Sequence, residues 1–95
     1  MPSTYDLIAD FLIEICNVHP NDITPDVNII DDLGVDSLAF MDVTYEIDRA
    51  FKIKLPVEDW IIDIDKKQAR IEDYFVMSRL VAKVEELATQ AANSP

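Results

Sequence analysis

The hydroxyl group of Ser37 is the side chain of this sequence best placed for covalent chemistry. It follows Gly34, the only glycine of the chain, by three residues, and glycine permits the positive φ that many tight turns require. Asp36 is a favourable N-cap, so we expect Ser37 at the first position of a helix with its hydroxyl outward. Free N–H groups and the positive end of the helix dipole favour an attached phosphate there by about 0.3–1 kcal/mol.

Taken alone, this local pattern leaves three interpretations of Ser37 open. Ser37 could receive a covalent group from another enzyme, be phosphorylated by a kinase, or serve only as a capping residue. Autonomous hydrolysis fits poorly, because a serine nucleophile needs a base and an oxyanion hole. The only histidine, His19, ends the first predicted helix and reads as a loop residue, and Val35 and Ala39 stand where a nucleophile elbow has glycine.

The sequence offers no convincing metal site. A calcium-binding loop starting at Asp26 has the wrong residue at its sixth position and Ser37 at its twelfth, where glycine and glutamate are required. Cys16 and His19 stand alone, so a structural zinc site has no ligand set. We expect no bound metal, and a small core residue at Cys16.

The charge of the chain is distributed unevenly. Of its 19 acidic residues, 11 fall before Arg49, which is the first basic side chain, and the net charge is −11. Such a field repels nucleic acids and anionic membranes, whereas it attracts proteins with basic patches. Acidity could also serve solubility alone, although solubility does not explain why the imbalance is confined to the half that carries Ser37.

Length and composition predict one small domain. The 95 residues suffice for a single core over residues 1–95. One cysteine rules out an internal disulfide framework and favours a reducing, cytoplasmic setting. We expect neither a membrane span nor a signal peptide, because no apolar run is long enough and the first residues lack a basic region.

Hydrophobic periodicity predicts an all-α bundle of four main helices, with a long first loop and a short third helix. Ser3 and Asp6 resemble a capping box at the start of the first helix. The loop carries four apolar residues that should hold it against the core, namely Val27, Ile29, Ile30 and Leu33. The predicted helices span residues 4–17, 37–51, 57–64 and about 71 or 74 to 91, with a polar linker at 65–70.

The second predicted helix has two apolar faces. One face should join the core and carries Phe40, Val43, Ile47 and Phe51. The other carries Leu38, Met41 and Tyr45 with charged residues on both sides. A helix of this kind either touches two cores or presents one face to a partner.

The segment from Asp31 to Leu38 resembles the modification motif of the acyl carrier proteins. The resemblance continues through Phe51 and Leu55-Pro56, and it covers about residues 4–90 in helix order. It implies that a phosphopantetheinyl transferase moves 4′-phosphopantetheine from coenzyme A onto Ser37, flanked by Asp36 and Leu38. The thiol of the arm then carries acyl chains as thioesters, and the chain itself is no enzyme. It also implies a right-handed four-helix bundle.

The resemblance gives roles to the two faces of the second helix. The exposed face becomes a docking surface for basic protein partners, made of Leu38, Met41, Tyr45, Asp42, Glu46 and Asp48. The alternative is that its apolar members pack under the long loop. The candidate residues of an acyl pocket, which could equally be ordinary core, are Phe40, Val43, Ile47, Phe51, Leu55, Ile62 and Leu80.

Several features resemble a specialised branch that carries very-long-chain hydroxylated fatty acids to an acyltransferase of lipid A. These features are the long segment from Pro56 to Phe75, Trp60, and the run from Glu72 to Val76. The family often has an acidic residue at the position of Ala39 and a helix that is acidic throughout, which Arg49 interrupts.

The expected partners are the transferase, ketosynthases with other enzymes of fatty-acid synthesis, and an acyltransferase, and the expected state is a monomer in the bacterial cytoplasm. The alternatives are a free-standing peptidyl or aryl carrier of an assembly line, or an unmodified acidic adaptor.

Overall fold

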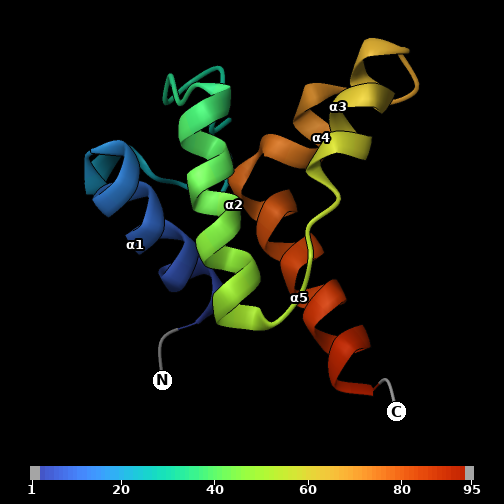
Figure 1. The fold of residues 1–95 in the computed structure, drawn as a ribbon. Helices are drawn as coiled ribbons and strands as arrows, with labels where there is room; N and C mark the ends of the chain where they lie inside the picture. Colours follow the sequence, from blue (N-terminus) through green and yellow to red (C-terminus); the bar gives the residue numbers. More distant parts are fainter. Residues whose placement is uncertain (1–2, 94–95) are drawn as a thin grey trace.

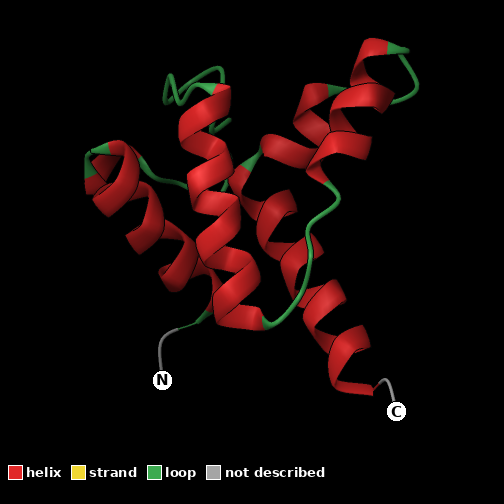
Figure 2. Cartoon of the chain, in the orientation of Figure 1, coloured by secondary structure: helices red, strands yellow, loops and turns green. Residues whose placement is uncertain are grey.

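The computed structural model describes residues 3–93 and shows an all-helical chain, as the sequence predicts (Figures 1 and 2). Within these residues there is no strand, only an isolated antiparallel bridge between Asn28 and Val76. The elements are α1 (Thr4–Cys16), the 3-10 helix η1 (Pro20–Asp22), α2 (Ser37–Phe51), α3 (Val57–Asp65), α4 (Ile71–Phe75) and α5 (Met77–Asn93).

Local signals set the starts of α1 and α2 as predicted, and α1 ends at Cys16, one residue before the predicted end. The Ser3 hydroxyl accepts a hydrogen bond from the Asp6 N–H at 3.1 Å, and the Asp6 carboxylate accepts one from the Ser3 N–H, which completes a capping box. Each helix ends at a residue in the left-handed conformation, Asn17 after α1 and Lys52 after α2. These caps satisfy backbone groups that a helix end would otherwise leave unpaired.

The core lies where α1, α2 and α5 run side by side (Figure 1). The long loop between α1 and α2 contributes Ile29, which is fully buried, while Val27, Ile30 and Leu33 pack against the core from its edge. The loop is therefore an ordered part of the fold, as its apolar residues predict. The largest fully buried side chains are Ile8, Leu12, Ile29, Val43, Ile47, Met77, Leu80 and Val84.

The predicted single last helix is wrong in one respect, because the structure interrupts it at Val76. This residue is extended, with φ −72° and ψ 132°. The long loop binds the chain on both sides of it: the Ile29 N–H donates to the Phe75 carbonyl at 2.9 Å, and the Met77 N–H donates to the Val27 carbonyl at 2.8 Å. These two bonds replace helical ones, so α4 leaves the direction of α5 and lies beside α3.

The start of α2 and the α3–α4 pair occupy the same end of the molecule, opposite the two chain ends (Figure 1). α3 ends at Asp65, as the periodicity indicates within one residue, and the polar stretch 66–70 forms the turn into α4. The fold thus brings Ser37, the first residue of α2, to the side where α3 and α4 project.

Candidate functional site

Asn28 organises the turn that leads to Ser37. Its side-chain Oδ1 accepts hydrogen bonds from the N–H groups of Ile30 and Asp31, at 3.0 and 2.9 Å. Its carbonyl accepts from Asp32 at 2.8 Å, and its own N–H donates to the Asp32 carboxylate at 2.8 Å. Asn28 is only 6% exposed. A buried amide with this many partners fixes the backbone around it.

Gly34 completes the turn with φ 68°, the positive value expected from the sequence. A Cβ atom at this position would meet nothing within 4 Å, so space is not the reason for glycine. The requirement is conformational, because other residues populate this backbone region at a cost.

The first turn of α2 presents the Ser37 hydroxyl to solvent. Asp36 is the N-cap, and its Oδ1 accepts a hydrogen bond from the Ala39 N–H at 2.8 Å. Ser37 is the first helical residue and is exposed, and no described residue hydrogen-bonds its hydroxyl. Asp36 therefore performs the capping, which leaves the Ser37 Oγ free for attachment of another group.

No described histidine is arranged as a catalytic base for Ser37. The Nδ1 of His19 accepts a hydrogen bond from the Asn21 N–H at 3.1 Å and caps η1. This is the loop position that the sequence predicts. The free Oγ is thus suited to act as the acceptor in another protein's reaction, with the activating base supplied from outside.

An apolar pocket of about 180 Å³ opens beside Ser37. Apart from Ser37 and Asp65 its walls are apolar, from the long loop, α2, α3 and α4: Ile30, Phe40, Met41, Val57, Ile61, Ile64, Ile71 and Phe75. Of the seven residues predicted for an acyl pocket, Phe40 alone lines this space.

The structure places the other six predicted pocket residues elsewhere. Val43, Ile47 and Leu80 are fully buried in the core, Leu55 is 4% exposed and lines a separate depression, and Phe51 is half-buried. Ile62 is 47% exposed, because Val57, Trp60 and Ile64 form the inward face of α3. That i, i+3, i+7 spacing could have placed Ile62 outside from the sequence alone.

The outer face of α2 is as accessible as a docking surface requires. Leu38 is 81% exposed, Met41 42% and Tyr45 61%, so these residues do not pack under the long loop. Arg49 lies at the end of this face, with its guanidinium 5.8 Å from the centre of the Tyr45 ring.

The predicted acidic residues of this surface differ in their surroundings. Asp42 is exposed and has no ion-pair partner among the described residues. Glu46 lies 3.8 Å from the Arg49 guanidinium. Asp48 has a structural role, because its Oδ1 accepts a hydrogen bond from the Leu55 N–H at 2.9 Å. Asp42 is therefore the acid of this set most available to a partner.

Aromatic packing joins α3 to α4, and α4 to α2. The rings of Trp60 and Tyr74 stack with their centres 4.8 Å apart and an angle of 4°. Phe75 meets Phe40 edge-on at 5.1 Å and Trp60 at 6.3 Å. The Tyr74 hydroxyl donates to the Asp63 carboxylate at 3.4 Å. These contacts set the position of the pocket wall relative to Ser37.

Two side chains near the site have perturbed acidities. Burial, assisted by the negative charges of Asp36 and Asp42, raises the pKa of the Cys16 thiol. The protonated, unreactive form is thereby favoured, in keeping with a half-buried structural cysteine. Desolvation is the main reason that the pKa of the Tyr74 phenol is raised, and the negative charge of the Asp63 carboxylate raises this pKa further.

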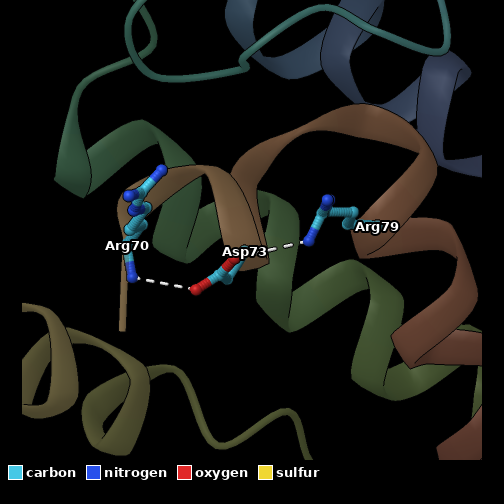
Figure 3. Close-up of polar contacts among 3 residues, drawn as sticks. All are labelled: Arg70, Asp73 and Arg79. Carbon is cyan, nitrogen blue, oxygen red and sulfur yellow. Dashed lines mark hydrogen bonds and ion pairs between the residues drawn. The ribbon is translucent and has the colours of Figure 1, made fainter. Parts of the chain in front are cut away.

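Asp73 anchors α4 (Figure 3). One carboxylate oxygen accepts from the Arg70 backbone N–H at 2.9 Å, and the other from the Arg79 guanidinium at 3.3 Å.

Residues 3–93 contain no group of three or more His, Cys, Asp or Glu side chains arranged to hold a metal ion. Within the same span, no helix combines the length and apolarity needed to cross a bilayer.

Comparison with known proteins shows the family of the chain. Residues 6–61 match the family described as "Phosphopantetheine attachment site". The acyl carrier protein AcpXL of Brucella melitensis is 44% identical over 87 residues, covering 92% of this chain and 94% of that protein. The proteins of the same name from Rhizobium etli and Rhizobium meliloti are 40% and 39% identical over 97% and 95% of this chain, and over 100% and 95% of their own lengths. The chain therefore belongs to the acyl carrier proteins, the family that holds its cargo on a covalently attached 4′-phosphopantetheine group.

Proposed function

We propose that Ser37 is the residue that carries the 4′-phosphopantetheine arm. The supporting observation is the free, exposed hydroxyl at the N-terminus of α2, next to an apolar pocket. The Asp36 carboxylate caps the helix, so the Ser37 hydroxyl is not needed for capping. A phosphate attached to this hydroxyl would lie at the N-terminus of α2, where it is favoured. The arm supplies the thiol on which acyl groups travel as thioesters.

The proposed cargo is a very-long-chain fatty acyl group used in lipid A synthesis. Support comes from the near full-length similarity to proteins named AcpXL, and from the α3–α4 segment that first indicated this branch. In the structure the two helices of this segment pack against each other, with Trp60 of α3 stacked on Tyr74 of α4. The chain acts as a carrier for other enzymes, in the bacterial cytoplasm, and catalyses no step itself.

The apolar pocket is the proposed site for the part of the acyl chain next to the arm. It shares Ser37 with the attachment site, and Phe40 and Phe75 form its wall toward the core. Among the residues predicted for this role, Phe40 keeps it and the structure adds Ile30, Ile61, Ile64 and Ile71.

The outer face of α2 is the proposed docking surface for the transferase, the ketosynthases and the acyltransferase. Its centre is apolar, with Leu38 and Met41, and Asp42 and Glu46 lie at its rim. An apolar centre with a charged rim is the usual anatomy of a protein interface, and the negative charge favours basic partners.

Intact mass tests the attachment site directly. The protein is incubated with coenzyme A and a phosphopantetheinyl transferase, and its mass should increase by one arm. Ser37→Ala should gain nothing. Ser78→Ala removes another exposed serine and should gain the arm like the parent protein. If the parent protein gains no mass, the chain is an unmodified acidic adaptor, and if Ser37→Ala still gains the arm, the site lies elsewhere.

A further inference from the structure

The turn between α3 and α4 is a basic island in an acidic protein. Lys66, Lys67 and Arg70 are all exposed, and none of them has an ion pair within residues 3–93. Of the two acids on α4, Asp73 already accepts from the Arg70 backbone and from Arg79, and Glu72 is exposed. The Arg70 guanidinium points away from the Asp73 carboxylate (Figure 3), and Arg70 is exposed.

This island borders the proposed attachment site. Lys67 and Arg70 line an open depression together with Ile64, and Ile64 also lines the apolar pocket that contains Ser37. The α3–α4 turn and the start of α2 lie at the same end of the molecule (Figure 1). A protein interface of standard size covers about 800 Å² on each partner, so a partner centred on Ser37 and the pocket also covers this turn.

The surface around Ser37 is consequently polarised. On the α2 side lie Asp42 and Glu46, in the half of the chain that has no cation before Arg49. On the other side three cations lie within five residues. The acids that flank them are Asp65 at the pocket, the exposed Glu72, and Asp63 and Asp73, which accept hydrogen bonds from Tyr74 and Arg79. A partner with a uniformly basic docking patch is attracted by α2 and repelled by the turn.

We propose that Lys67 and Arg70 select the protein partners of this carrier. The favoured partner is basic where it faces α2 and acidic where it faces the α3–α4 turn. Like charges placed opposite each other disfavour the wrong partner, and this is a common source of specificity between related complexes. The inference rests on the proposed function, because it assumes that partners dock over Ser37.

The test uses a fluorescent analogue of coenzyme A, which a phosphopantetheinyl transferase attaches to Ser37. The labelled protein is titrated with a β-ketoacyl synthase of general fatty-acid synthesis, chosen for a basic docking patch, and the dissociation constant is measured by anisotropy. Lys67→Glu with Arg70→Glu should bind this enzyme about five- to tenfold more tightly at low salt, because repulsion becomes attraction. The gain should shrink in high salt, since exposed charges are screened.

A matched variant controls for net charge. Lys52→Glu with Lys54→Glu makes the same change in charge at the C-terminal end of α2. This end is about 20 Å from Ser37 along the helix axis. With both variants compared at about 0.1 M ionic strength, where the Debye length is about 10 Å, the control variant should alter binding by less than about twofold. Lys67→Ala with Arg70→Ala provides a milder version should the double reversal disturb folding, as checked by circular dichroism.

The outcomes separate the two proposals. Tighter binding of the turn variant than of the control supports selection by Lys67 and Arg70. Equal binding of the two variants, or weaker binding of the turn variant, overturns it while the attachment site stands. Failure of the parent protein to take the label at Ser37 overturns the proposed function and this inference with it.

Discussion

The long loop before α2 and the α3–α4 segment both border Ser37, but different forces hold them. The loop is fixed by directional hydrogen bonds around Asn28 and by two backbone bonds to residues 75 and 77. The α3–α4 segment is fixed by aromatic packing centred on Trp60. Directional hydrogen bonds thus shape the turn that leads to Ser37, whereas aromatic packing makes the main contact between α3 and α4 in the pocket wall.

The largest expected effect breaks the aromatic side of this comparison. Trp60 is 3% exposed, so Trp60→Ala should lower the free energy of unfolding by about 3–5 kcal/mol, the usual cost of removing a large buried aromatic side chain. Urea titration followed by circular dichroism measures it. Ile62→Ala, on the exposed side of the same helix, should stay within about 0.5 kcal/mol. Similar losses in both variants would show that α3 does not pack through Trp60.

A smaller effect is expected on the hydrogen-bonded side. Asn28→Ala leaves the N–H groups of Ile30 and Asp31 without their acceptor, which should cost about 1–3 kcal/mol of stability. The variant should also slow the transfer of phosphopantetheine to Ser37, because the turn before α2 loses its fixed shape. Asn21→Ala changes an exposed asparagine of η1 and should affect neither quantity.

Stability and the rate of phosphopantetheine transfer, measured for both Asn28→Ala and Trp60→Ala, test which of the two regions positions Ser37. Loading by the transferase, measured under conditions where each variant is folded, should fall more for Asn28→Ala than for Trp60→Ala, although the second variant loses more stability. The reverse order would mean that the pocket wall positions the serine.

The sequence predicted the elements whose signals are local. Ser3 with Asp6 marked the start of α1, and Gly34 with Asp36 marked the turn into α2, whose span agrees with the structure. The exposed face of α2 also followed from helical periodicity, because Leu38 lies on the side of the helix away from Phe40.

The sequence did not predict features that depend on contacts between distant segments. The break at Val76 arises because Val27 and Ile29 bond to residues on both sides of it, and the continuous apolar run 74–77 gives no local sign of an extended residue. The pocket walls depend on how α3 and α4 lie against the start of α2. For this reason periodicity along α2 places Val43 and Ile47 on the buried face with Phe40, but it does not indicate that only Phe40 reaches the pocket beside Ser37.

The smallest expected effect concerns Tyr74, where the two kinds of force meet. Desolvation and the nearby Asp63 carboxylate raise its pKa above the ordinary value of about 10. The folded protein therefore holds the phenolic proton more tightly than the unfolded chain does. The stability that Tyr74 contributes is present below the ordinary pKa and is lost as the pH rises through the folded value.

Difference titration of tyrosine absorbance between the parent protein and Tyr74→Phe isolates this phenol, which should ionise above the ordinary tyrosine range. Asp63→Asn removes the neighbouring charge and the ionised acceptor, so it should lower the pKa while the stacked Trp60 still shields the ring. Since desolvation is the larger cause, part of the upward shift should survive in that variant. A Tyr74 pKa that returns fully to the ordinary value in Asp63→Asn would instead assign the whole shift to the carboxylate, and the ring would then owe its position to that polar contact rather than to aromatic packing.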